Sequence, residues 1–173
     1  MLRRALWSVL AQTRLPRAVI VEFDGDHTGA AATKNRALAR VDTEWVAWLD
    51  DDDQFLPLHL EALATAQQAT GADVIYPWPV MDGADDPRPD RFGKPFDAAE
   101  LRRGSYIPTT SLFRTSLAKA AGGFRSPPGS NYDDWGLYLG MLERGATFFH
   151  LPVRTWVWNV RPGMNTSGQP DRW

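Results

Sequence analysis

The chain has 173 residues, of which 43% are hydrophobic and 23% charged, values typical of one globular domain. Its formal net charge of −2 gives no general attraction to nucleic acid or to an anionic membrane. The absence of cysteine excludes disulfides and thiolate metal sites. No apolar run approaches the roughly 20 residues that a membrane-spanning helix needs, and no signal-peptide pattern is present. We therefore expect a cytoplasmic domain without a membrane segment.

The first part of the chain alternates between helix and strand patterns. Apolar residues at helical spacing predict an amphipathic helix over 1–13, and a β-rich run predicts a strand over 18–23. A helix capped by Thr28 and continuing to about Leu38 would carry Lys34. Such alternation implies right-handed crossovers and a parallel sheet with helices on its faces.

The most informative stretch is the apolar run 45–49, which leads directly into the four consecutive aspartates 50–53. Its apolar residues occupy both parities, which indicates a strand buried on both faces. Ligands of open α/β sheets bind beyond the carboxyl ends of the strands. A divalent cation that also holds a phosphate would offset these carboxylates there. The alternative is a solvated acidic turn that caps the helix expected from Pro57.

The rest of the chain is predicted as a mixture of short elements around one long excursion. Residues 77–96 are rich in proline and charge, which predicts a surface loop or short hairpin. The other expected elements are helices over 57–70 (closed by Gly71), 97–103, 115–121 and 132–144, strands over 73–76, 111–114, 146–150 and 153–160, and a polar tail from Arg161.

Five short motifs, in this order, resemble those of the family-2-type glycosyltransferases of the GT-A fold. They are Ser8–Thr13, Phe23–Gly25, Lys34–Leu38, the Asp-x-Asp-containing stretch Leu49–Pro57, and Gly122–Phe124 followed by Tyr132–Trp135. The resemblance implies an α/β, Rossmann-like GT-A fold with a mostly parallel central sheet, helices on both faces and a small mixed C-terminal part. It also implies a single domain over 1–173, with a nucleotide-sugar-binding half (1–76) and an acceptor and catalytic-base half (77–173).

Two features depart from the family pattern. The family opens with a strand that lines the nucleotide pocket, and this chain begins after it, so we expect a sheet that lacks this strand. Either the start is truncated, or this is a reduced version of the fold. Arg161 stands where the family's tail carries a histidine. An arginine can bind phosphate but cannot ligate a metal.

The resemblance also implies roles for the acidic run. A departing nucleoside diphosphate needs its charge neutralised, which Mn²⁺ or Mg²⁺ does. By its position in the motif, Asp52 is the expected metal ligand, while Asp50 and Asp51 are placed for the donor ribose or around the metal. Asp53 is interpreted as a cap of the next helix.

Three further residues complete the expected donor site. By resemblance Asp24 contacts the nucleotide base, although an Asp-Gly pair also commonly forms a turn. Lys34 is either a cation for the base or diphosphate or a solvated helical lysine, and Arg161 would bind phosphate.

Asp134 is the expected general base, with Asp133 beside it. Adjacent acids raise each other's proton affinity, which suits a base that works near neutral pH. The alternative is an acidic pair that stabilises the start of a helix. One base and no nucleophile imply direct displacement with inversion.

The predicted function is therefore an inverting, metal-dependent glycosyltransferase that uses a nucleotide sugar, with a UDP-sugar as first choice and an unidentified acceptor. A glycosidase also uses two carboxylates, but that chemistry does not explain the aspartate run. A nucleotidyltransferase of similar architecture and an inactive nucleotide-binding domain remain as alternatives.

Overall fold

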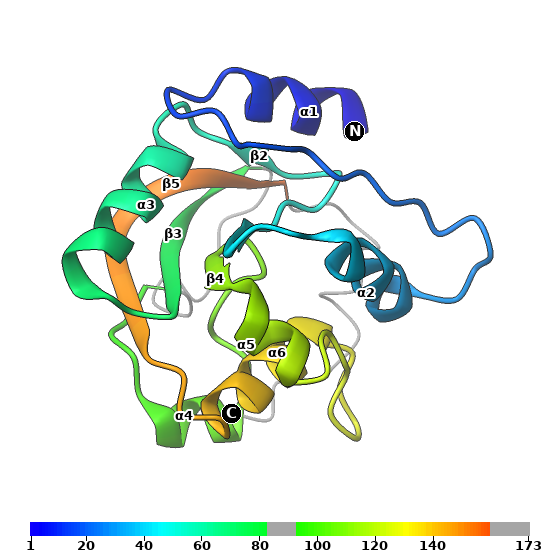
Figure 1. Cartoon of the computed structure of the whole chain (residues 1–173), viewed down its shortest axis with the longest axis vertical. Coiled ribbons are helices and arrows are strands. Elements are labelled where there is room, and N and C mark those ends of the chain that lie inside the picture. Colours follow the sequence, from blue (N-terminus) through cyan, green and yellow to red (C-terminus); the bar gives the residue numbers. More distant parts are fainter. Residues whose placement is uncertain (83–92, 160–173) are drawn as a thin grey trace.

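The computed structural model describes residues 1–82 and 93–159 (Figure 1). Its elements are α1 (Leu2–Leu10), α2 (Ala30–Arg40), β1 (Trp45–Ala47), β2 (Gln54–Phe55), α3 (His59–Thr70), β3 (Val74–Asp82), α4 (Ala98–Arg103), β4 (Leu112–Arg114), α5 (Thr115–Ala120), α6 (Asp133–Leu142) and β5 (Phe148–Asn159). In this part of the chain no helix is long and apolar enough to cross a membrane.

The five strands form one curled sheet in the order β1-β4-β3-β5-β2 (Figure 1). Only β3 and β5 pair in parallel, and the other three pairs are antiparallel. The α/β fold class is confirmed, but the sheet is mixed in its pairing. β1, β3 and β5 share one direction, as the helix-strand alternation predicts. The short β4 and β2 run against them.

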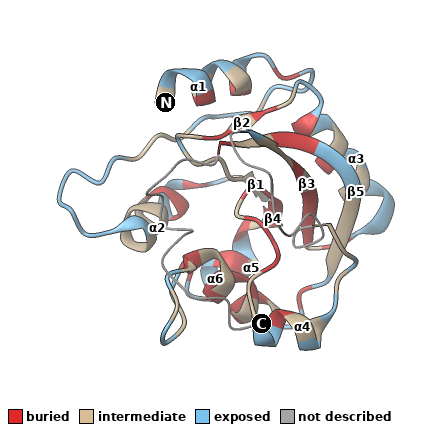
Figure 2. Cartoon of the chain, turned by 180° about the vertical axis from the view of Figure 1, so that it is seen from behind, coloured by how far each residue is buried: buried red, intermediate tan, exposed pale blue. Residues whose placement is uncertain are grey.

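Helices cover both faces of the sheet, as predicted. The side chains of β3 alternate between the two faces, as the pleat of a strand requires. Val74 and Tyr76 pack into the main core with α5 and α6, whereas Ile75 packs with Leu63 of α3. All four side chains are fully buried, and Figure 2 shows β3 in the buried colour. β3 therefore packs against helices on both sides of the sheet, with α5 and α6 on one side and α3 on the other.

Several predicted boundaries are wrong. The segment 18–23 forms no strand, since it makes no backbone–backbone hydrogen bond with any part of the chain that the structure describes. α2 begins at Ala30, and its N-cap is Gly29 rather than the expected Thr28. Gly29 has a φ of 93°, a backbone conformation that glycine adopts readily and other residues rarely adopt. In the second half, β3 continues through Asp82 where a loop was expected, and β5 is one strand rather than two. The rest of the predicted excursion, 83–92, and the tail lie outside the described residues.

Candidate active site

Lys34 joins the donor-side and base-side parts of the predicted site. Its Nζ lies 3.0 Å from Oδ1 of Asp133 and 3.6 Å from Oδ1 of Asp50, and its side chain is 15% exposed. Burial alone would lower the pKa of Lys34, but Asp50, Asp133 and the nearby Asp134 outweigh it and raise the pKa. Lys34 therefore stays charged and holds the start of α6 against the segment that follows β1.

Asn35, the next residue on α2, fixes the Gly-Gly-Phe motif. Its Nδ2 donates to the carbonyl oxygen of Phe124 at 2.8 Å, and the Phe124 N–H donates back to its Oδ1 at 2.8 Å. Gly123 adopts a φ of +72°, and a Cβ there would lie 2.1 Å from Asn35 Oδ1. The Phe124 ring, in turn, lies under Lys34 Nζ at 5.4 Å. The hydrogen bonds between Asn35 and Phe124, which we call the Asn35 joint, thus hold the loop before α6 against α2.

Asp134, the expected general base, is held by two hydrogen bonds. Its Oδ2 accepts from Thr109 Oγ1 at 2.8 Å, and its Oδ1 accepts from the Trp135 N–H at 2.7 Å. Burial raises the pKa of Asp134, against the opposing effects of Lys34 and of the Thr109 hydrogen bond. The two hydrogen bonds fix the carboxylate plane, and the raised pKa increases its affinity for a proton.

Asp133 is the more deeply enclosed member of the pair. Only 7% of the residue is exposed, and its Oδ2 is buried with no hydrogen-bond partner among the described residues. Both aspartates lie in the first turn of α6, where the helix dipole also stabilises their negative charge. The predicted helix-stabilising role and the catalytic role are therefore compatible.

The four aspartates after β1 differ in environment. Asp51 is exposed, Asp50 and Asp52 are half-buried, and Asp53 is 5% exposed. Asp53 Oδ1 accepts from the Asn159 N–H at 3.1 Å, and Asn159 Nδ2 donates to the Asp52 carbonyl oxygen at 2.5 Å. Burial, reinforced by the neighbouring aspartates, raises the pKa of Asp53 to about 8. The helix-cap interpretation of Asp53 is wrong. The Asp53 side chain is hydrogen-bonded to β5 and makes no capping hydrogen bond to α3.

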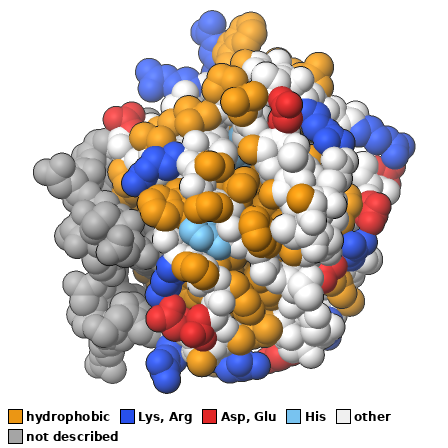
Figure 3. Space-filling model, turned by 90° about the vertical axis from the view of Figure 1, so that its left-hand side faces the viewer, with side chains coloured by type: hydrophobic (Ala, Val, Ile, Leu, Met, Phe, Trp, Pro, Cys, Tyr) orange, Lys and Arg blue, Asp and Glu red, His pale blue; other side chains and the backbone are white. Residues whose placement is uncertain are grey.

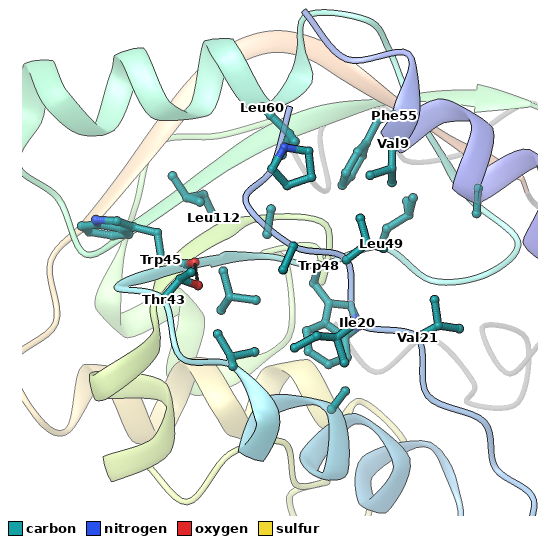
Figure 4. Close-up of a pocket in the computed structure, with 18 of the residues that line it drawn as sticks. Val9, Ile20, Val21, Thr43, Trp45, Trp48, Leu49, Phe55, Leu60 and Leu112 are labelled. Atoms are coloured by element: carbon teal, nitrogen blue, oxygen red, sulfur yellow. Dashed lines mark hydrogen bonds between the residues drawn. The ribbon is translucent and has the colours of Figure 1, made fainter. Parts of the chain in front are cut away.

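A cavity of about 1200 Å³ lies between α1, the segment 14–24 and β1. Figure 4 shows its apolar part, where Ile20 and Val21 lie opposite Trp48 and Leu49. Its polar lining includes every predicted donor-binding residue that the structure describes: Asp24, Lys34, Asp50 and Asp51. Four residues from three separate parts of the chain thus surround one space.

The sequence profile of Glycosyl transferase family 2 matches residues 16–122. The chain belongs to glycosyl transferase family 2. The matched region contains the acidic run and Lys34, and it ends before the Asp133–Asp134 pair. Among curated proteins no sequence matches this family-2 chain.

Solved structures of S. aureus TarS share the fold of this family-2 chain. TarS 1–349 in complex with UDP superposes with a TM-score of 0.70 at 18% identity, covering 93% of this chain and 57% of TarS. The complex with UDP-GlcNAc gives a TM-score of 0.63 at 17% identity, covering 91% and 45%. The chain therefore spans about half the length of these structures. At this low sequence identity, the structural likeness establishes the GT-A-type fold and nothing further.

Metal ligation by this family-2 chain stays a prediction. Within 1–82 and 93–159 no three His, Asp or Glu side chains gather closely enough to form a metal cluster. A metal that also holds phosphates typically uses only one or two protein carboxylates. The acidic run offers hard carboxylate oxygens of the kind Mn²⁺ and Mg²⁺ prefer and so fits such an ion. Asp50 and Asp51 line the cavity, whereas the half-buried Asp52 does not.

Asp24 uses both carboxylate oxygens within its own loop. They accept from the backbone N–H groups of Thr28 at 2.8 Å and Gly29 at 3.1 Å. Desolvation opposes ionisation of Asp24, but these hydrogen bonds outweigh it and lower the pKa. Asp24 therefore orders the start of α2, and contact with a nucleotide base stays a prediction for it. Arg161 lies outside the described residues.

Sequence reasoning did not foresee two contacts that shape the site. Asn35 lies inside the Lys34–Leu38 motif, but its partner Phe124 is 89 positions away. No pattern within a short stretch of sequence could therefore predict that the two residues pair. Thr109 supplies a hydroxyl to Asp134 from outside any motif.

Proposed function

We propose that this chain transfers a glycosyl group from a nucleotide sugar to an acceptor hydroxyl, with inversion at the anomeric carbon. The observation that carries the proposal is the buried contact of Lys34 with both Asp50 and Asp133. It brings the polar end of the cavity next to a base-like aspartate, Asp134. A transferase needs this arrangement, because donor and acceptor hydroxyl must meet at one carbon.

The donor side of the proposal rests on charge and shape. A nucleoside diphosphate would lie in the cavity with its polar groups toward Lys34, Asp50 and Asp51. Mn²⁺ or Mg²⁺, held by Asp52, would neutralise the charge that develops on the departing diphosphate. The complexes of TarS with UDP and UDP-GlcNAc support a UDP-sugar as the donor.

The acceptor side rests on Asp134. Its carboxylate takes the proton of the acceptor hydroxyl as the new glycosidic bond forms. Lys34 and the Thr109 hydroxyl lower the pKa of Asp134 and so favour the ionised carboxylate that a base needs. Burial acts in the opposite direction and keeps its affinity for a proton high. We assign Asp134 as the only base and no residue as a covalent nucleophile, and a single base implies one displacement and therefore inversion.

A screen of UDP-sugars for hydrolysis and transfer with Mn²⁺ tests the proposal. We expect metal-dependent turnover by the wild type, its loss in Asp52→Asn, and loss of transfer with retained donor binding in Asp134→Asn. Glu143→Gln is the matched control, because Glu143 is exposed and does not line the cavity. Unchanged turnover in both site variants would disprove the assignments. Metal-dependent UDP binding without any turnover would instead favour an inactive nucleotide-binding domain.

A further inference from the structure

The N-terminal part of the chain is positively charged, although the net charge of the whole chain is negative. The first 21 residues contain four arginines and no acidic residue, although the whole chain carries −2. Arg17 pairs with Asp42 at 3.8 Å. Arg3, Arg4 and Arg14 make no side-chain hydrogen bond or ion pair within the described residues. This end of the protein is therefore locally cationic.

Helix α1 exposes large apolar side chains among these arginines. Residues three and four positions apart share one face of a helix, so Arg3, Arg4, Trp7 and Leu10 form one outward surface, the α1 patch. Trp7 is 61% and Leu10 is 62% exposed, while Ala5 on the opposite face is 4% exposed. The inward face of α1 packs against β2 (Figure 1), whereas Trp7 and Leu10 on the outward face are exposed.

The α1 patch continues into the segment that follows the helix. Arg14 and Leu15 come next, and Leu15 is 65% exposed. Figure 3 shows basic and hydrophobic side chains together at the top of the molecule, where α1 lies. Exposed tryptophan and leucine between arginines are typical of helices that lie in the interface of a bilayer.

The composition of the patch selects among occupants. In a two-fold dimer through this patch the arginines of the two copies would face one another, and like charges in contact oppose association. A nucleic acid would satisfy the arginines but would offer no apolar layer for Leu10. An anionic lipid surface satisfies both, because its headgroups attract arginine and its acyl boundary accepts Trp7 and Leu10.

We propose that the α1 patch docks this protein on the surface of an anionic lipid bilayer. The inward face of the same helix, including Ala5 and Val9, lines the cavity that reaches Lys34 and Asp50. Docking therefore holds one wall of the cavity beside the membrane. The inference does not depend on the proposed transferase activity.

Co-sedimentation with vesicles tests this surface directly. We expect the full chain to bind vesicles that contain phosphatidylglycerol and not vesicles of phosphatidylcholine alone. Raising the ionic strength from about 0.1 M to about 1 M shortens the Debye length from about 10 Å to about 3 Å, and should release the protein. Because each arginine near an anionic surface contributes roughly fivefold in binding, Arg3→Glu/Arg4→Glu should weaken it by more than tenfold.

Two further variants separate docking from alternatives. Trp7→Ser/Leu10→Ser should weaken vesicle binding without changing the unfolding midpoint, because both side chains are already exposed. Arg102→Glu/Arg103→Glu, an exposed basic pair on α4, is the matched control and should bind as the wild type does. Equal loss in the control, or vesicle binding unaffected by the α1 variants, would overturn the proposal. A dimer in sedimentation velocity that Trp7→Ser/Leu10→Ser abolishes would also overturn it, in favour of a second copy.

Discussion

The Nζ of Lys34 lies 3.0 Å from Oδ1 of Asp133, although 99 positions separate the two residues in the chain. This contact joins the helix that follows the first loop to the helix that carries the proposed base. The same ammonium group lies 3.6 Å from Asp50. One buried cation therefore links the proposed donor side of the site to the proposed acceptor side.

Removal of that cation should destabilise the protein. Lys34→Met leaves Asp133 buried without its ion-pair partner, and we expect a loss of about 3 kcal/mol in the free energy of unfolding. Urea denaturation measures it. Arg17→Met, which breaks an ion pair whose side chains are 74% and 76% exposed, should cost no more than about 1 kcal/mol. Equal effects of the two substitutions would show that the Lys34 contact contributes nothing special.

The Asn35 joint predicts a non-additive pair of substitutions. Gly122 and Gly123 both have positive φ, so alanine at either should cost about 1 kcal/mol in backbone strain. At Gly123 the new methyl group would also collide with Asn35 Oδ1, whereas at Gly122 the nearest atom is 3.9 Å away. Gly123→Ala should therefore cost clearly more than Gly122→Ala.

A double-mutant cycle isolates this collision. In an Asn35→Ala background the extra cost of Gly123→Ala should disappear, and the cost of Gly122→Ala should not change. Additive free energies for Asn35 and Gly123 would contradict the described joint.

The secondary structure could be predicted where the pattern is local. The helix that ends at Gly71 was expected from a glycine just past an apolar helical pattern, and Gly71 adopts a left-handed φ of 69° there. The strand that begins at Val74 was expected from its apolar run, and it is buried on both faces. The segment 18–23 has an equally strong β pattern and forms no strand. A strand needs a neighbour, and a pattern within one segment does not show whether a neighbour is present.

The candidate site divides in the same way. Asp24, Lys34, Asp50 and Asp51 were expected together, and they line one cavity. The contacts that position the site were not foreseen. Thr109 reaches Asp134 across 25 positions. Such long-range partners are chosen by packing, and a single sequence carries no signal for them.

The hydroxyl of Thr109 should set the pH dependence of transfer. A hydrogen bond to a carboxylate stabilises its charged form, so Thr109→Val should raise the pKa of Asp134 beyond the increase that burial already causes. Because the base must be ionised, the rate rises as pH passes through this pKa. The ascending limb of the kcat/KM profile should therefore move to higher pH in Thr109→Val.

Thr109→Ser retains the hydroxyl and should restore the wild-type profile. The charged neighbours Lys34 and Asp133 are unchanged in both variants. A Thr109→Val enzyme with lower activity but an unshifted profile would assign Thr109 to packing alone.

Buried His59 should make the protein sensitive to acid. It is fully buried, with its Nδ1 2.8 Å from Thr155 Oγ1 and its ring stacked on Phe55. Burial lowers the pKa of His59 from 6.5 to about 3. The folded state therefore binds fewer protons than the unfolded state between these values. Stability is complete above about pH 6.5 and is lost as pH falls, by up to about 1.4 kcal/mol per pH unit.

Denaturation curves at about pH 7 and about pH 4.5 measure this loss, which His59→Gln should reduce by about 2.5 kcal/mol. His27→Asn, at an exposed loop position, should follow the wild type. Parallel pH dependences of the wild type and His59→Gln would refute this origin of acid sensitivity.

Electron paramagnetic resonance of Mn²⁺ tests the donor site most directly, because the signal of the free aqueous ion is lost when the ion is immobilised on the protein. With UDP present, we expect the wild type to remove the free-ion signal at stoichiometric protein. Under the same conditions Asp52→Asn should leave the signal of the Mn²⁺–UDP mixture unchanged, while Glu143→Gln, an exposed carboxylate outside the cavity, should behave as the wild type. Equal loss of the signal with wild type and Asp52→Asn, or no loss with either, would contradict a metal-held diphosphate at the end of β1.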